Sequence, residues 1–561
     1  AGAAAAAVQD GRAAAAVASI ESMLDGAHTA SWDAALGAVG LSDPTRLSAA
    51  EIRRCRACNQ GRLAALLGRT TRLLWQLTQL DAAALAEARP RARLLNTLRV
   101  LTRLLPLLLE DGSDVGVAHL LWTRLPAAPF PEAAAAAAAA STSGGETDDL
   151  FSLGGCLLRG LVGAHFVPGF TLLPDSAASG TGANPWAASS GTIDEARDAA
   201  LEALLACCSG VLYTPPGELG RAPNWLLLSA VHTSDSQAKS LFRALLCVVF
   251  SYDPVGWGVP YMHSLVPDTH HQVLHHGVQL LLVLLSQPLA PPAADGAPPP
   301  DDKVVRLLGG LQRPETLGFV ISGFGRLLRN AFATQRTYLP GSLVALECEQ
   351  ELLLLLWTFA HHSRAFLTAL LASPELADVL MAVCFCVLSW ASDAPNSSLV
   401  HLCILTLLVI SAEPGFGAAA QAPCPHSLPL RGRAARATSA SLADLVVGAA
   451  AEVLLGGHGR LESVHPAALA VLANVTPHAH SLSADATARL LQCLGLLTAP
   501  RYLLASPARP DNLLVLLDAV NAALLHPPQP NEALLHGLVL LSAELGALRA
   551  LKPADADDAD A

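Results

Sequence analysis

The chain has 561 residues, of which 52% are hydrophobic but only 5% aromatic, so Ala and Leu supply most of its apolar content. Both are strong helix formers, whereas strands favour Val, Ile, Tyr and Phe, and this composition therefore predicts an all-helical protein. With 47 acidic against 35 basic residues the formal net charge is -12, which gives no broad electrostatic attraction to nucleic acid and argues against a nucleic-acid partner.

The start of the chain, residues 1–29, is an Ala-rich low-complexity segment. It lacks the basic beginning and the continuous apolar run of a signal peptide, so we expect a cytosolic protein. The chain has twelve cysteines, and many lie inside apolar runs, among them Cys247, Cys384, Cys386, Cys403 and Cys493. We expect these to be small buried hydrophobes with free thiols in a reducing compartment.

Apolar residues recur at helical spacing along most of the chain. The clearest amphipathic stripes lie at 94–108, 201–212, 317–328 and 490–497. Pro106 is expected to kink the end of the first helix. Before the second stripe, Thr192 stands three residues ahead of Glu195, a spacing that predicts a capping box.

An irregular α-solenoid, in which armadillo- or HEAT-like helical hairpins stack on one another, would bury all of these stripes. We expect one such region over residues 30–551. Four stretches rich in Pro, Gly, Ser and Ala interrupt it and are expected to be mobile, disordered insertions: 126–148, 174–191, 286–302 and 413–439. The acidic tail, 552–561, is expected to be solvated.

Two apolar runs, 376–390 and 399–412, raise the question of a membrane span, because the mean hydropathy of the chain is +0.42. A spanning helix needs about 20 predominantly apolar residues, and both runs are shorter. A turn-like segment separates them. The sequence therefore predicts a buried helical hairpin.

No familiar catalytic motif can be found in the sequence, neither a nucleophile elbow nor a phosphate-binding loop, dinucleotide fingerprint or metalloprotease helix. Cys55 and Cys58 have the spacing of half a zinc site, but no second such pair follows. A metal-dependent enzyme would have its best site in the histidine cluster formed by His270, His271, His275 and His276. No carboxylate lies within that run to complete a site, so we interpret the cluster as partly exposed histidines at a helix start. We predict no catalytic, cofactor-binding or metal-binding residue and no small-molecule substrate.

One aromatic loop differs from its helical surroundings, because it combines prolines, glycines and aromatic residues over 251–263. Its candidate residues are Tyr252, Asp253, Pro254, Gly256, Trp257, Gly258, Pro260 and Tyr261. A rigid loop of this kind could recognise a partner or could pack as a plug across the ends of helices, and we favour the plug.

The loop is also similar to the most distinctive signature of the high-temperature-induced dauer-formation family. Dymeclin is a more distant relative of that family. Further segments resemble the family in the same order, at 96–111, 337–357, 441–461 and 472–491. The resemblance covers roughly residues 30–550.

The resemblance implies a non-enzymatic peripheral membrane protein on the cytosolic face of medial and trans-Golgi cisternae, with protein partners from the trafficking machinery. It also implies a role in protein sorting and secretory-vesicle formation. Animal members of the family resemble substrates for myristoylation, but here Ala1 precedes Gly2 and Ala6 occupies the hydroxyl position, so we assign no lipid site. The alternative is a soluble α-solenoid adaptor that holds a cytosolic enzyme or a cargo.

Overall fold

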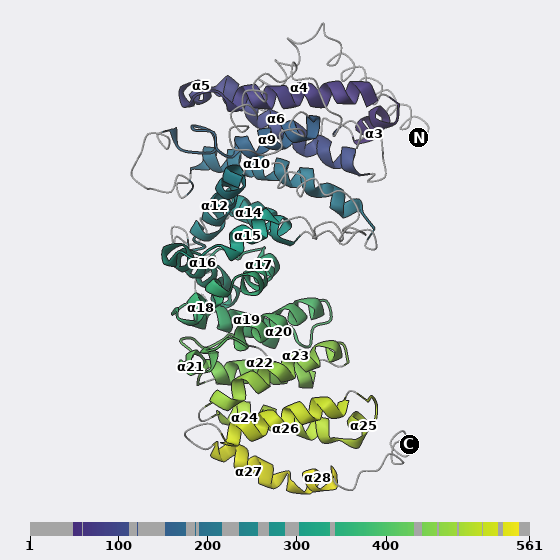
Figure 1. Cartoon of the computed structure of the whole chain (residues 1–561), viewed down its shortest axis with the longest axis vertical. Coiled ribbons are helices and arrows are strands. Elements are labelled where there is room, and N and C mark those ends of the chain that lie inside the picture. Colours follow the sequence, from purple (N-terminus) through teal and green to yellow (C-terminus); the bar gives the residue numbers. More distant parts are fainter. Residues whose placement is uncertain are drawn as a thin grey trace. The chain divides into compact units, whose positions relative to one another are not determined.

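The computed structural model describes residues 49–58, 60–110, 121, 152–174, 186, 190–215, 235–255, 269–286, 302–336, 343–430, 440–456, 459–479, 482–507, 509–525 and 531–548. Over these ranges the regular secondary structure is helical, and isolated β-bridges pair Pro168 with Leu172 and Pro423 with Ser441. The prediction of an all-α fold is confirmed (Figure 1).

Contacts divide the chain into two compact units. Unit 1 comprises residues 1–251 and 268–307, and unit 2 comprises 252–267 and 308–561. We expected one solenoid region over 30–551, and each unit is described below by itself.

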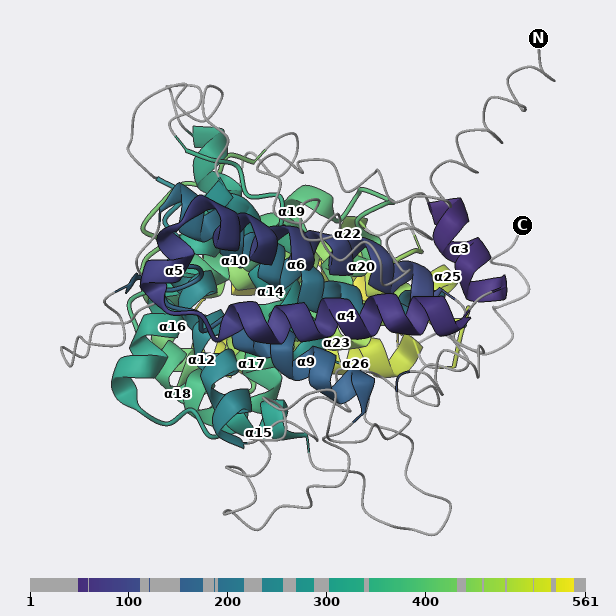
Figure 2. The same cartoon turned by 90° about the horizontal axis from the view of Figure 1, so that it is seen from above.

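In its described residues unit 1 is built of packed helices. Its helices are α3 (Ala49–Cys58), α4 (Gln60–Thr78), α5 (Ala82–Ala86), α6 (Ala88–Leu109), α9 (Leu153–Ala164), α10 (Gly191–Cys208), the 3-10 helix η5 (Ser209–Tyr213), α12 (Asp235–Ser251), α14 (Thr269–Ser286) and the start of α15 (Lys303–Gly309). Helix α10 packs between α6 and α14, and α4 packs against α6 and α9 (Figure 2). The predicted stripes at 94–108 and 201–212 lie on α6 and on α10 with η5, which confirms both helices.

The contact between α4 and α9 depends on a glycine. A Cβ atom added to Gly160 would lie 2.9 Å from Leu74 Cδ2, closer than real side chains approach. Trp75 of α4 also donates from Nε1 to the carbonyl of Cys156, at 2.8 Å. The small side chains of α9 therefore let the two helices come close together.

Unit 2 is a stack of helical hairpins in two layers. Its helices are α16 (Pro314–Ala333), η7 (Thr334–Arg336), α17 (Glu349–His362), α18 (Arg364–Leu371), α19 (Leu376–Trp390), α20 (Ser397–Ser411), α21 (Phe416–Ala419), α22 (Leu442–Gly456), η9 (Glu462–Val464), α23 (His465–Val475), η10 (Thr476–His478), α24 (Ala484–Thr498), α25 (Pro500–Leu503), α26 (Arg509–Leu525), α27 (Glu532–Leu540) and α28 (Ser542–Ala547). One layer runs α16, α19, α22, α24 and α27, and the other runs α17, α20, α23 and α26, with each helix contacting the next in its layer (Figure 1).

Partners within a hairpin also pack across the two layers of unit 2, as α16 does with α17, α19 with α20, α22 with α23 and α24 with α26. Each hairpin thus buries its apolar faces on its own two helices and on its neighbours. This is the stacked-hairpin arrangement of an α-solenoid that the sequence predicts.

The two apolar runs flagged in the sequence form α19 and α20, which pack against each other as the predicted buried hairpin. Residues 379–387 of α19 are all at most 3% exposed, because the helix is covered by α16, α20 and α22. Among the described helices none is by itself long and apolar enough to cross a membrane, whereas α18 and α19 pass that test as a pair but are bent by 103°.

Helix α10 begins earlier than the predicted capping box. Its N-cap is Ser190, whose Oγ accepts a hydrogen bond from the Ile193 amide at 3.4 Å. Glu195 instead accepts a hydrogen bond from Arg99 of α6, at 2.9 Å. The capping-box assignment to Thr192 and Glu195 is therefore wrong, because an upstream serine supplies the cap and Glu195 pairs between helices.

The insertion predicted at 413–439 contains an anchored segment. Within its described part, 413–430, Phe416 opens α21 and is only 1% exposed. The amides of Leu442 and Ala443 donate to the carbonyls of Ala422 and Ala420, at 3.0 and 2.8 Å. One buried aromatic residue and these backbone bonds hold the segment against α22, which a composition rich in small residues does not reveal. Most of the other three insertions, and the segments 1–29 and 552–561, lie outside the described residues.

Candidate functional site

The aromatic loop is described only at its start, Tyr252 to Val255. Tyr252 is buried at 3% exposure, and its carbonyl accepts a hydrogen bond from Arg326 Nε of α16 at 2.9 Å. The buried Pro254 accepts from the amide of Val344 at 3.2 Å. Asp253 is exposed, and its Oδ1 accepts from the amide of Val255 at 3.0 Å, which closes a local turn.

A second contact fixes residues 344–346, the segment that the loop meets. Asn330 of α16 donates to the carbonyl of Val344 at 2.8 Å and accepts from the amide of Leu346 at 3.1 Å. The start of the loop thus packs inside unit 2 as a structural element. The candidates Gly256, Trp257, Gly258, Pro260 and Tyr261 lie outside the described residues, so the interaction role of the loop stays a prediction.

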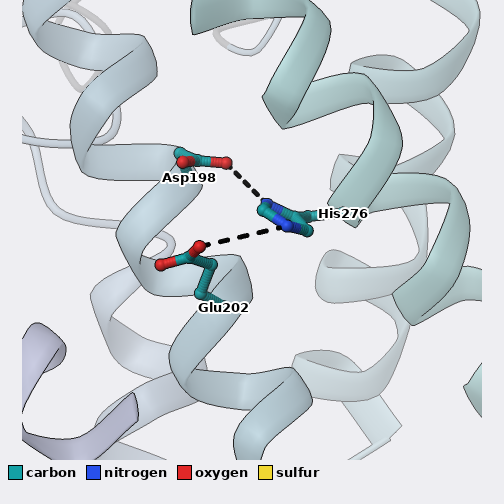
Figure 3. A group of neighbouring side chains, drawn as sticks. All are labelled: Asp198, Glu202 and His276. Carbon is teal, nitrogen blue, oxygen red and sulfur yellow. Dashed lines mark hydrogen bonds and ion pairs between the residues drawn. The ribbon is translucent and has the colours of Figure 1, made fainter. Parts of the chain in front are cut away.

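The histidine cluster lies on α14, and the structure brings carboxylates to it from another helix. Asp198 and Glu202 are one turn apart on α10, facing α14. His276 Nδ1 lies 2.7 Å from Asp198 Oδ1, and His276 Nε2 lies 4.0 Å from Glu202 Oε1 (Figure 3). The single imidazole ring is therefore placed between two carboxylates.

The charges of this group act on one another. Burial lowers the pKa of His276, but the hydrogen bond to Asp198 and the charges of Asp198 and Glu202 outweigh it, so the pKa is raised. Burial and the charge of Asp198 raise the pKa of Glu202, and His276 and Arg99 offset part of that shift. The three side chains form one electrostatic unit at the contact between α10 and α14.

The other cluster histidines have different partners. His275 stacks on His276, with ring centroids 5.9 Å apart, and its Nε2 lies 3.0 Å from Gln279 Nε2. His270 Nδ1 lies 3.4 Å from Asp194 Oδ1. Asp198 and Glu202 therefore gather at His276.

Asp198 and Glu202 are site residues that we did not single out from the sequence. Asp198 is separated from His276 by 78 positions, so no local spacing connects them. The one signal is the pair of acids at i and i+4 on a helix, a spacing equally typical of a solvated face.

Arg197, the fully buried arginine of α10, lies beside this group and serves packing. Its Nε donates to the carbonyl of Thr171 at 2.9 Å, and Asp194 lies 3.5 Å from its Nη1. Its guanidinium also lies over the ring of Trp186, 5.1 Å from the centroid. These contacts satisfy the buried charge and anchor Trp186, a residue of the predicted insertion 174–191.

The described cysteines behave as predicted from their apolar surroundings. Cys384, Cys386, Cys403 and Cys493 are buried free thiols, and Cys247 is half-buried. Burial raises the pKa of Cys348 and Cys493 to about 12, which keeps these thiols protonated and unreactive at neutral pH. The side chains of Cys55 and Cys58 lie outside the described residues.

A family model described as "High-temperature-induced dauer-formation protein" (Hid1) matches residues 45–557. The chain belongs to the Hid1 family. Among curated relatives it is 27% identical to Protein HID1 of Homo sapiens over 527 residues, which covers 88% of this chain and 64% of the human protein. It is 23% identical to Protein HID1 of Dictyostelium discoideum, covering 63% of this chain and 41% of that protein.

A shorter match connects this Hid1-family chain with the Ubp5-interacting protein ftp105 of Schizosaccharomyces pombe, at 23% identity over 34% of this chain and 21% of that protein. The chain thus spans less than two thirds of the length of the curated relatives. The family resemblance expected over roughly 30–550 is confirmed over nearly the same range.

Proposed function

We propose that this chain is a non-enzymatic scaffold that acts peripherally on the cytosolic face of medial and trans-Golgi cisternae, in protein sorting and secretory-vesicle formation. The observation that carries the proposal is the match to the Hid1 family over residues 45–557. The finer role comes from what resemblance to that family implies, and the family match supports it.

The structure of unit 2 supports binding rather than chemistry. Its two layers of stacked helices present long side-chain surfaces, which in solenoid proteins serve as sites for protein segments. We propose that partners are trafficking proteins held along these surfaces. We further propose that the chain is not an enzyme, because its sequence carries no catalytic motif.

The proposal is tested by locating the full-length tagged protein in cells. We expect perinuclear puncta that coincide with a medial or trans-Golgi marker, and a tag alone serves as the diffuse control. In membrane fractions the protein should pellet with Golgi membranes and be released by an alkaline carbonate wash. Uniform cytosolic fluorescence would contradict the Golgi role, and retention after the carbonate wash would contradict peripheral attachment.

A second candidate function, a soluble adaptor, is favoured by the name of one relative. The fission yeast relative is called a Ubp5-interacting protein, so a member of this group is named for binding another protein. Proximity labelling separates the two proposals, because a Golgi scaffold labels Golgi proteins whereas a soluble adaptor labels one cytosolic enzyme or cargo.

A further inference from the structure

Three metal-ligating side chains meet where α10 packs on α14 (Figure 3). Asp198, Glu202 and His276 each offer one ligand atom, and these atoms all lie within 4.8 Å of one another. The side chains retain 18, 41 and 23% of their exposure, so an ion could reach them from solvent. This is the only such group among the residues whose side chains the structure describes.

The donor set selects a class of cation. Calcium and magnesium ions prefer all-oxygen ligands, whereas an imidazole nitrogen together with carboxylate oxygens suits zinc and its first-row neighbours. Asp198 and Glu202 come from successive turns of one helix and His276 from another, so a bound ion would connect α10 to α14. Such a cation would cross-link the two packed helices.

Asp198 is placed to orient the ring. When Asp198 accepts a hydrogen bond from Nδ1 at 2.7 Å, the lone pair of the neutral imidazole is on Nε2, which faces Glu202. A carboxylate, a histidine and a metal in this order are the usual outer-shell arrangement of metal sites. In a tetrahedral site two metal–ligand bonds of about 2.0–2.2 Å place their ligand atoms roughly 3.4 Å apart. A small rotation of the glutamate would bring its Oε1 to that separation from Nε2, starting from the 4.0 Å of this structure.

The local charge also favours a cation. The carboxylates of Asp198 and Glu202 lie close together and repel each other when both are charged. Arg99 also acts on Glu202, but its Nη2 is bound to Glu195 at 2.9 Å. A proton on His276 or a divalent ion on its Nε2 would each relieve the repulsion, and the two exclude each other.

We propose that Glu202 and His276 bind a divalent transition-metal ion of the zinc class, with Asp198 positioning the imidazole and water completing the coordination. The ion fastens α10 to α14 within unit 1 and has a structural role. This inference rests on unit 1 alone and is independent of the proposed Golgi function.

The test uses the full-length protein, purified and freed of metal with a chelator. Zn²⁺ is titrated by calorimetry, and Co²⁺ binding is followed by its visible absorption. We compare the wild type with His276→Ala, Glu202→Gln and Asp198→Asn. The matched control is His275→Ala, since His275 directly precedes His276 on α14 and is bound to Gln279. Circular dichroism checks that each variant is folded.

We expect the wild type to bind one ion and to gain thermal stability with Zn²⁺. His276→Ala and Glu202→Gln should lose at least tenfold in affinity, Asp198→Asn should lose about 10–100-fold, and His275→Ala should stay within twofold of wild type. Binding should weaken as the pH falls, because the proton on Nε2 competes with the ion. The proposal is overturned if the wild type binds no ion, or if folded His276→Ala binds as tightly as wild type or His275→Ala loses as much as His276→Ala.

Discussion

Asn531 is the side chain whose removal gives the sharpest test of how the end of unit 2 is held together. It is 3% exposed and makes three hydrogen bonds to the backbone. Its Oδ1 accepts from the amide of Leu482 at 2.8 Å, and its Nδ2 donates to the carbonyls of Ala523 and Ala479 at 2.7 and 3.2 Å. One amide group therefore connects the segment before α24, the end of α26 and the start of α27.

The substitution Asn531→Ala would leave three backbone groups without their partner. A buried polar group that loses its hydrogen bond costs about 1–3 kcal/mol, so three of them give a loss of at least about 3 kcal/mol in the free energy of unfolding. Asn531→Asp has the same shape but cannot donate to the two carbonyls when ionised, so we expect it to be no better than alanine.

Urea unfolding of the full chain measures the loss, and hydrogen exchange locates it. Because stability in a helical stack is a sum of neighbouring contacts, exchange should rise in α24, α26 and α27 and stay unchanged in α16 and α17. Asn512→Ala is the matched control, since Asn512 makes one long hydrogen bond to Tyr502 Oη at 3.4 Å and should cost less than about 1 kcal/mol. Equal losses for the two variants, or exchange raised throughout unit 2, would refute this account.

Substitutions at three further sites test other parts of the structure. Burial lowers the pKa of His165 from 6.5 to about 4. Between these two pH values the unfolded chain therefore binds a proton at this histidine, whereas the folded chain does not. Stability should therefore fall as the pH falls from 6.5, and His165→Gln should remove about 2 kcal/mol of the loss between pH 7 and pH 5, measured by urea unfolding. Gly415 has φ of 95° with open space around it, so Gly415→Ala should cost about 1–2 kcal/mol through the backbone alone and Gly415→Asn should cost less in the same measurement. Arg489 of α24 forms an ion pair with the mostly buried carboxylate of Glu452 on α22. Arg489→Ala would leave that carboxylate without this partner and should lower the free energy of unfolding by about 3–5 kcal/mol. The double variant with Glu452→Leu should recover part of that loss.

The periodic apolar stripes of the sequence predict most of the fold. They are correct for the helices of both units, for the hairpin of α19 and α20 and for the stacking of hairpins in unit 2. These features follow from burying Leu and Ala at helical spacing, which is a local property of the sequence.

The candidate site depends instead on contacts between distant segments. The histidine run on α14 is visible in the sequence, but its carboxylate partners on α10 are brought to it only by the packing of the two helices. In the same way a single phenylalanine, Phe416, anchors a segment whose composition indicates disorder. Such pairings depend on which helix faces come together, and one sequence by itself does not specify that.

The layered order of unit 2 has a consequence for how the protein comes apart. Because every hairpin is sandwiched only by the hairpins before and after it, cutting a connecting turn near the end should release whole hairpins and leave the remainder intact. Limited digestion of unit 2 should thus yield a ladder of fragments whose sizes step by one hairpin at a time.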